Sequence, residues 1–285
     1  MCILLLLATC WGVYVYRVKQ PEVAVHFIDV GQGDAALLIT PHGKAVMFDT
    51  GGTRGNVFDV GEKIDLPYLR HYGIRELSAI FLTHAHEDHA AGAGSLLRAL
   101  PVERVFTAGE GRAVYEKSLS LSADENLSEK LTVANEGQTV TIDGVTITTV
   151  YAPTVTTSEA GNEASNVYRI SYGNFSVLIT GDIEAAGEEE LVAAGKIAPC
   201  SVLKMAHHGS RTSNTEEFLR AAAPQAIIFC VGRDNSFGHP HAEVLARVKE
   251  SGTKIYRTDE DGAVIFTSDG RTMRTETFYG SGRKQ

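Results

Sequence analysis

The sequence predicts an α/β fold in which two β-sheets pack face to face and helices cover their outer faces. Strand-like and helix-like stretches alternate in both halves of the chain, a pattern typical of layered α/β architectures. Four apolar strands also end in Asp or His, which indicates a functional edge where several strand ends meet. With 285 residues, 44% of them hydrophobic, the chain can form one large domain.

The first half begins with short strands separated by glycine-rich turns. In chain order we expect strands at 23–30, 35–40 and 45–48, a helix at 59–72, a buried strand at 77–82 and a helix at 90–100 that Pro101 ends.

The second half begins with antiparallel strands and then alternates again. We expect an antiparallel region at 131–151 turning at Asp143-Gly144, a hairpin at 167–179 around Gly173-Asn174, strands at 202–205, 226–231 and 254–256, and helices at 215–222 and 242–250. The polar segment 155–166 is expected to be a surface loop, and the tail 279–285 to be disordered.

The strongest chemical signal follows the buried strand at 77–82, where His84, His86, Asp88 and His89 lie within six positions. Alternate side chains at a strand end point to one side, so His84 and His86 can face one ion. Asp88 and His89 can then face a second ion beside it. Imidazole and carboxylate suit Zn²⁺, Mn²⁺ or Fe²⁺, and two ions about 3.5–4 Å apart can hold a bridging hydroxide as nucleophile. The competing interpretation is a chance polar cluster on a solvated turn.

Four further features fit the same site, although each alone could be an ordinary turn or cap. Asp49 ends a strand where it could orient a ligating histidine, and Asp182 ends another where it could bridge both ions. The pair His207-His208 ends a third strand, and His239 lies in a turn.

The run 29–35, which contains Asp34, joins two strands through glycines that permit a tight approach to the site.

These residues resemble the metallo-β-lactamase superfamily: the His-x-His-x-Asp-His motif at 84–89, the preceding Asp49 and the later Asp182 and His207/His208 occur in the family's order. The resemblance implies a four-layer αββα sandwich with the site at one edge of both sheets. The runs 29–35, 178–182, 203–210 (ending in Ser210) and 238–240 are similar to the C-terminal hydrolase domains of ComEC-type DNA-internalisation competence proteins. This resemblance covers about residues 23–266.

One departure from the wider superfamily concerns the first ion. Lactamases and glyoxalase-like members place a third histidine between positions that correspond to 90 and 206, and this chain has none there. Asn162 lies near the expected position and could offer an amide oxygen. The resemblance then implies a first ion held by His84, His86 and Asp182, either Zn²⁺ or Mn²⁺, and argues against β-lactamase activity.

The expected reaction is phosphoester hydrolysis by a di-metal centre. Asp182 would bridge the ions, Asp88 would accept the proton of the hydroxide and His239 would protonate the leaving oxygen. Lys204 either contacts a phosphate or is a solvated lysine. Strand-end geometry favours His207 as a ligand and analogy with the superfamily favours His208, so both stay candidates.

The resemblance implies a nuclease acting on DNA in a DNA-uptake context. The alternative is a hydrolase of another phosphodiester, such as a phosphorylcholine ester, and a non-catalytic binding module is a third hypothesis. The net charge of −9 offers no overall basic field for nucleic acid.

The N-terminal stretch 2–16 has no charged residue. It is shorter than the roughly 20 residues that span a bilayer and lacks the basic residues that precede a signal-peptide core. We expect residues 1–22 to be a membrane-helix stump, an anchor or an export signal, residues 23–278 to form the hydrolase domain, and the protein to lie at the membrane or outside the cytoplasm. Cys200 and Cys230 are expected to be buried small residues.

Overall fold

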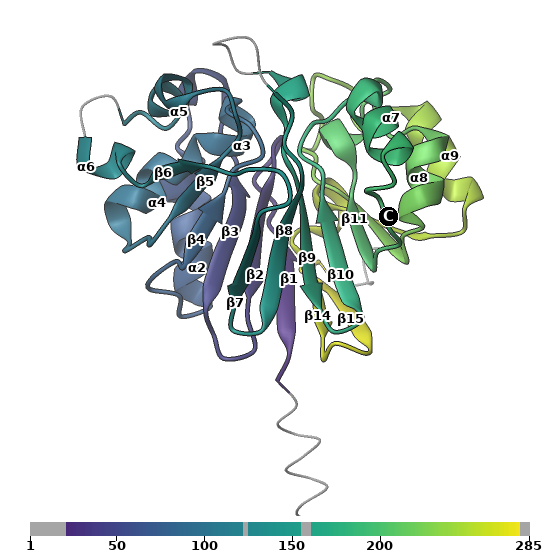
Figure 1. The fold of residues 1–285 in the computed structure, drawn as a ribbon, viewed down its shortest axis with the longest axis horizontal. Helices are drawn as coiled ribbons and strands as arrows, with labels where there is room; N and C mark the ends of the chain where they lie inside the picture. Colours follow the sequence, from purple (N-terminus) through teal and green to yellow (C-terminus); the bar gives the residue numbers. More distant parts are fainter. Residues whose placement is uncertain (1–20, 122–124, 155–160, 280–285) are drawn as a thin grey trace, which may run out of the picture.

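Two mixed β-sheets form the centre of the molecule and helices cover both outer faces, as Figure 1 shows. The computed structural model describes residues 21–121, 125–154 and 161–279. The four-layer αββα sandwich expected from the sequence is therefore confirmed.

The first sheet has eight strands in the order β15-β14-β1-β2-β3-β4-β5-β6. Their bounds are β1 Val23–Phe27, β2 Ala35–Ile39, β3 Ala45–Thr50, β4 Ala79–Phe81, β5 Val105–Thr107, β6 Leu131–Val133, β14 Val264–Ser268 and β15 Met273–Thr277.

The second sheet has seven strands in the order β13-β12-β11-β10-β9-β8-β7. Their bounds are β7 Thr139–Ile142, β8 Val145–Tyr151, β9 Val167–Tyr172, β10 Phe175–Ile179, β11 Val202–Lys204, β12 Ala226–Phe229 and β13 Lys254–Arg257.

The helices divide between the two outer faces (Figure 1). The first sheet carries α2 Leu66–His71, α3 Glu87–Ala90, α4 Gly92–Ala99, α5 Arg112–Ser118 and α6 Glu125–Ser128, and the second carries α7 Ala185–Ala193, α8 Glu216–Ala222 and α9 Ala242–Glu250. The short helix α10 Thr258–Asp261 follows β13.

In both sheets, antiparallel strands occupy one side of the sheet and parallel strands the other. The parallel strands are β3 to β6 in the first sheet and β10 to β13 in the second. Parallel strands bring their carboxyl ends to one edge of a sheet, where α/β proteins bind ligands. The strand-end Asp and His residues therefore gather at one edge of the sandwich.

Three apolar clusters separate the four layers. One lies between the sheets, where the Phe81 ring stacks between the rings of Phe48 and Phe106. The second fills the space under α2 and α4, and the third the space under α7, α8 and α9. Cys200 and Cys230 are buried in the third and first clusters, as expected.

Several sequence predictions need correction. Residues 131–133 form β6, which pairs in parallel with β5 in the first sheet instead of joining the antiparallel β7 and β8. The expected surface loop 155–166 has a buried end, because Asn166 is 0% exposed and its backbone N–H bonds to Thr83. Its residues 155–160 lie outside the described part.

The ends of the fold reach slightly beyond the expected domain. The Tyr172 hydroxyl donates to the Pro21 carbonyl, Glu22 pairs with Arg274, and the Tyr279 N–H bonds to Asp261. The N-terminal stretch 1–20 and the tail 280–285 lie outside the described residues. Within the described ranges, no helix is long and apolar enough to cross a membrane.

Asp65 is a buried carboxyl group whose ionisation destabilises the fold. It is 0% exposed, and neither oxygen accepts a hydrogen bond from a described residue. Burial, with a contribution from Asp59, raises its pKa well above the usual value. The folded protein therefore keeps a proton that the unfolded chain loses above about pH 4, and stability falls by up to about 1.4 kcal/mol per pH unit as the pH rises toward the folded-state pKa.

We expect Asp65→Asn to remove this loss. Urea unfolding of the chelator-treated protein at pH 5, 6.5 and 8 should show the variant gaining stability over the parent as the pH rises. Asp234→Asn, at an exposed position, is the control. Parallel pH profiles for Asp65→Asn and its parent would contradict the assignment.

Candidate metal centre

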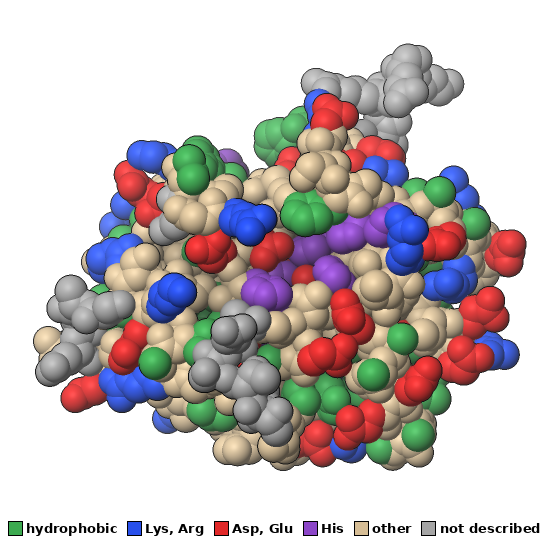
Figure 2. All heavy atoms as spheres, turned by 90° about the horizontal axis from the view of Figure 1, so that it is seen from above, with side chains coloured by type: hydrophobic (Ala, Val, Ile, Leu, Met, Phe, Trp, Pro, Cys, Tyr) green, Lys and Arg blue, Asp and Glu red, His purple; other side chains and the backbone are tan. Residues whose placement is uncertain are grey.

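The histidines meet at the sheet edge where the parallel strands end. Figure 2 views this face and shows a band of histidine side chains reaching the surface among acidic and basic groups. The band joins two structural halves, because His84, His86 and His89 follow β4 while His207, His208 and His239 follow β11 and β12.

His84 and His86 point nitrogen atoms at one another. His84 Nε2 lies 3.0 Å from His86 Nδ1. His84 Nδ1 lies 3.2 Å from the hydroxyl oxygen of Thr83, which donates its own proton to Asp49. The proton of His84 therefore belongs on Nδ1, which leaves Nε2 free as a ligand. These two histidines can hold one ion, as their spacing predicts.

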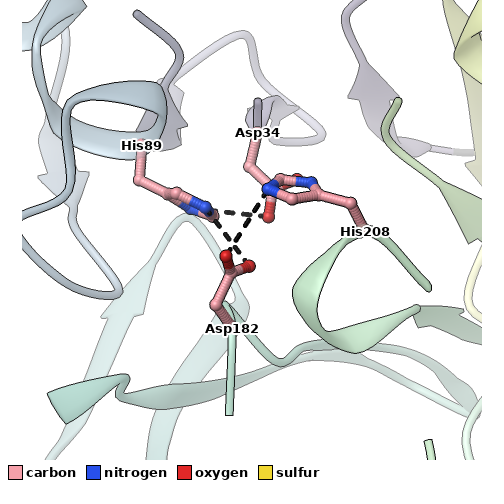
Figure 3. A group of neighbouring side chains, drawn as sticks. All are labelled: Asp34, His89, Asp182 and His208. Carbon is pink, nitrogen blue, oxygen red and sulfur yellow. Dashed lines mark ion pairs between the residues drawn. The ribbon is translucent and has the colours of Figure 1, made fainter. Parts of the chain in front are cut away.

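A second set surrounds the Asp182 carboxylate, as Figure 3 shows. His89 Nε2 lies 3.2 Å from Asp182 Oδ1, and His208 Nε2 lies 3.5 Å from Asp182 Oδ2. Asp88 Oδ2 joins them at 3.4 Å from His208 Nε2. Asp88, His89, Asp182 and His208 thus converge as candidate ligands of an ion.

Asp49 fixes the orientation of His89. Its carboxylate accepts hydrogen bonds from the backbone N–H and hydroxyl of Thr83, both at 2.8 Å, and lies 2.9 Å from His89 Nδ1. A carboxylate behind a histidine holds the ring and directs Nε2 toward a metal. The geometry is the one expected for Asp49 from the sequence.

The turn after β11 separates the roles of the two adjacent histidines. Both have left-handed backbones, with φ of 49° at His207 and 53° at His208. His208 is buried, and its Nδ1 lies 2.9 Å from the Cys230 carbonyl, which leaves Nε2 toward Asp182. His207 Nε2 stays 3.9 Å from Asp182, and its ring faces Asn162.

Asp34 lies behind the ligand set. It belongs to a group of four residues, with His89, Asp182 and His208, whose ligand atoms fall within 4.8 Å of one another. However, Asp34 meets Nδ1 of His89 at 3.6 Å and Nδ1 of His208 at 3.3 Å, whereas Asp182 meets Nε2 of both. We therefore place Asp34 as a group that supports the two histidines.

The position of Lys204 corrects the expectation that it is solvated or contacts a substrate phosphate. Its side chain is 1% exposed, forms an ion pair with Asp34 and donates a 2.8 Å hydrogen bond to the Gly181 carbonyl. Burial alone would raise the pKa of Asp34, but Lys204 and the two histidines hold it below its usual value. Lys204 is therefore a positioning residue.

Buried carboxylates give the centre the negative charge that attracts a metal cation. Asp34, Asp49 and Asp182 are almost fully buried, and the buried ammonium group of Lys204 lies beside Asp34 and Asp182. Burial opposes protonation of His208, yet Asp182 and Asp34 raise its pKa to about 10.

Several buried polar atoms of the same centre face one another at 3.2–3.5 Å but form no hydrogen bond within the described part of the chain. His89 Nε2, Asp182 Oδ1 and His208 Nε2 have no hydrogen-bond partner among the described residues. Imidazole nitrogens and carboxylate oxygens that converge in a buried site without hydrogen bonds are the ligand atoms that a divalent metal ion binds.

Two other predicted residues, Asn162 and Ser210, lie beside the centre. The Asn162 amide is 3.3 Å from His207 Nε2 and 3.4 Å from Glu184 Oε1. Ser210 is 4% exposed and bonds to Thr212, so its hydroxyl supports the histidine turn.

His239 is 9% exposed, and its ring centroid is 5.6 Å from that of His207. Burial, followed by the neighbouring histidines, lowers its pKa to about 4. It is therefore a neutral imidazole in the free protein, which does not favour the expected role as a proton donor.

The glycines of the 29–35 run permit the tight approach that the sequence predicts. A Cβ on Gly33, where φ is 141°, would lie 2.4 Å from the Asp88 carbonyl oxygen. A Cβ on Gly52 would lie 1.9 Å from the Glu87 carbonyl oxygen. Both loops therefore press against the backbone that carries Asp88 and His89.

Glu110 is a site residue that the sequence did not reveal. It is 3% exposed and accepts hydrogen bonds from the N–H groups of Ala85 and Gly161 and from the Tyr115 hydroxyl. It thus ties the loop between His84 and His86 to the segment that carries Asn162. Its position after a strand end is the signal that the sequence offers, but β5 has only three residues, too few for a periodic pattern that predicts a strand.

The comparisons with known proteins agree with this geometry. The sequence matches the metallo-β-lactamase superfamily over residues 28–233. It is 31% identical over 271 residues to ComE operon protein 3 of Bacillus subtilis, covering 90% of this chain and 34% of that protein. It is 30% identical over 250 residues to competence protein ComA of Neisseria gonorrhoeae, covering 87% of this chain and 33% of that protein. The chain spans about a third of the length of these relatives, and the resemblance to competence proteins is confirmed.

Solved structures support the fold. The metallo-β-lactamase fold protein YhfI from Bacillus subtilis has a TM-score of 0.51 at 15% identity, covering 82% of this chain and 96% of that one. The diiron β-hydroxylase CmlA from Streptomyces venezuelae has a TM-score of 0.53 at 14% identity, covering 90% of this chain and 54% of that one. At such identities the likeness concerns the fold alone.

Proposed function

Since the chain belongs to the metallo-β-lactamase superfamily, we propose that it is a metal-dependent phosphodiesterase that cleaves DNA. The observation that carries the proposal is the convergence of Asp88, His89 and His208 on Asp182, beside the His84 and His86 pair. Relatives named as competence proteins favour DNA as the substrate.

The chain's own groups supply the framework for two ions, Zn²⁺ or Mn²⁺. His84 and His86 would hold one, and Asp88, His89 and His208 the other, with Asp182 between them. Such ions lower the pKa of water and neutralise charge on phosphoryl oxygens. Asp49 and the Cys230 carbonyl hold the rings of His89 and His208, so both ligands are preorganised.

His239 would contact the leaving group as a hydrogen-bond donor. Its ring lies between His207 and the exposed Phe237, at the rim of the centre. A neutral imidazole has one N–H to donate, so this role does not need a charged ring. We propose that this bond stabilises the departing oxygen.

The biological setting is also a proposal. Competence relatives of about three times the length of this chain suggest that the domain acts at the membrane during DNA uptake. The apolar stretch 2–16 would then attach the protein to the membrane.

The test compares the hydrolysis of several substrates by the 285-residue protein loaded with Mn²⁺ or Zn²⁺. Single-stranded DNA, duplex DNA, a phosphorylcholine ester and a β-lactam are incubated with the parent protein, with Asp182→Asn and with the control Glu250→Gln, which neutralises an exposed carboxylate. We expect metal-dependent DNA cleavage that Asp182→Asn lowers by about 10³-fold or more and Glu250→Gln leaves unchanged.

The outcomes separate the hypotheses. Cleavage of the choline ester but not of DNA would replace the proposal with hydrolysis of a small phosphodiester. DNA cleavage that survives Asp182→Asn would contradict the metal centre. Metal-loaded protein that hydrolyses none of the phosphodiesters would favour a binding module.

A further inference from the structure

We propose that Phe237 stacks on an unpaired nucleobase and thereby places the adjacent phosphate at the metal centre. The inference rests on the proposed function and narrows its substrate to single-stranded nucleic acid. In a duplex both faces of each base are covered by neighbouring bases, whereas an unpaired base offers a face to an aromatic ring.

Phe237 is an exposed aromatic residue at the rim of the centre. The residue is 63% exposed, and the centroid of its ring lies 5.7 Å from that of the His239 ring at an interplanar angle of 21°. The phenyl ring is thus stacked beside a histidine of the site while most of the residue is exposed to solvent. An exposed phenylalanine lacks the hydrophobic stabilisation that burial would give it, so its exposure at a site calls for an explanation.

The loop that carries Phe237 is held in one conformation by Asn235. The Asn235 amide donates to the carbonyls of His239 at 2.6 Å and Gly232 at 3.0 Å. Its Oδ1 accepts the His239 N–H at 3.0 Å. The phenyl ring therefore stands on a short, cross-linked turn, and a rigid aromatic group loses little conformational entropy when it binds a flat ligand.

A pair of exposed apolar residues lies in a loop next to the metal motif. Val57 is 89% exposed and Phe58 is 45% exposed. Their loop is tied to the helix of Asp88 by a 2.6 Å hydrogen bond from the Gly55 N–H to Glu87. Exposed apolar groups near a polar centre fit a ligand that alternates flat bases with phosphates.

Stacking also suits the charge of the protein. With a net charge of −9, the chain lacks the basic field that supplies non-specific binding to nucleic acid. Base stacking on an aromatic ring contributes about 1–3 kcal/mol per base and does not depend on sequence. The affinity for single strands would therefore come from aromatic contacts near the site.

The test removes the aromatic ring and the bases in turn. Phe237→Ala is compared with the parent on a single-stranded oligonucleotide and on an abasic oligonucleotide of equal length. We expect KM for the base-bearing strand to rise about 5–150-fold with little change in kcat, and Phe237→Trp to restore it. On the abasic strand the same comparison should differ by less than about twofold. Phe278→Ala, at a residue 77% exposed beside the outermost strand β15, is the control.

The possible results distinguish a failure of the stacking role of Phe237 from a failure of the proposed nuclease function. If the parent cleaves single strands and Phe237→Ala raises KM equally on both substrates, or on neither, the stacking role is wrong while the nuclease stands. If the parent cleaves no DNA, the proposed function fails first. Binding can then still be followed by quenching of Trp fluorescence in Phe237→Trp with Asp182→Asn, against Asp182→Asn alone, and absence of quenching by single strands would overturn the inference.

Discussion

Replacing His208 with Asn should lower DNA cleavage by about 10³-fold or more, as is found when one of several residues that act together is removed. His207→Asn should lower it by only about 10–100-fold, the range typical of residues beside a metal ligand. The two residues are adjacent and of one type, but only His208 directs Nε2 into the buried set with Asp88 and Asp182. His207 is 21% exposed at its side chain and faces Asn162 and Glu184.

Asn is the informative replacement at both positions. Both backbones are left-handed, a conformation that Asn tolerates better than Ala. At position 208 the Asn amide can still donate to the Cys230 carbonyl in place of the Nδ1–H, while its side chain ends short of the Nε2 position. The variant therefore removes the ligand atom and keeps the support.

Metal content measured by mass spectrometry and binding by titration calorimetry should follow activity. We expect His208→Asn to lose at least one equivalent of metal and His207→Asn to keep both. Equal losses in the two variants would mean that both histidines bind metal, and a larger loss in His207→Asn would reverse the assignment.

The residues whose proximity can be predicted from the sequence are those that local geometry brings together. His84, His86, Asp88 and His89 span one strand end and one helix start, so their meeting needs no long-range contact. Asp182 was also predictable, because an apolar strand followed by Gly-Asp points to the carboxyl edge of a parallel sheet.

The remaining residues depend on contacts that spacing does not encode. The choice between His207 and His208 follows from two left-handed residues, which break the alternation expected at a strand end. Lys204 is buried because Asp34, from the other sheet, lies opposite it. The short strand β5 and the pair β14 and β15 were missed, since three to five residues carry little periodic signal.

The ion pair of Lys204 with Asp34 should show the largest effect on stability. We expect Lys204→Met to lower the free energy of unfolding by about 3–5 kcal/mol, because it leaves a buried carboxylate without its cation. Asp34→Asn should lower the free energy of unfolding by a similar amount. The Lys204 ammonium group would then retain only its hydrogen bond to the Gly181 carbonyl and its 3.6 Å contact with Asp182.

The double variant Lys204→Met with Asp34→Asn tests whether the loss of unfolding free energy in each single variant comes from the charge left unpaired. Removing both charges of a buried pair is often close to neutral, so the double variant should recover most of the stability that either single variant loses. Urea unfolding of chelator-treated protein, followed by circular dichroism, measures all three. Lys196→Met is the matched control, because its ion pair with Glu136 is partly exposed and should contribute no more than about 1 kcal/mol. Additive losses in the double variant would show that Lys204 and Asp34 stabilise the fold separately, and that the support of His89 and His208 by Asp34 does not depend on the lysine.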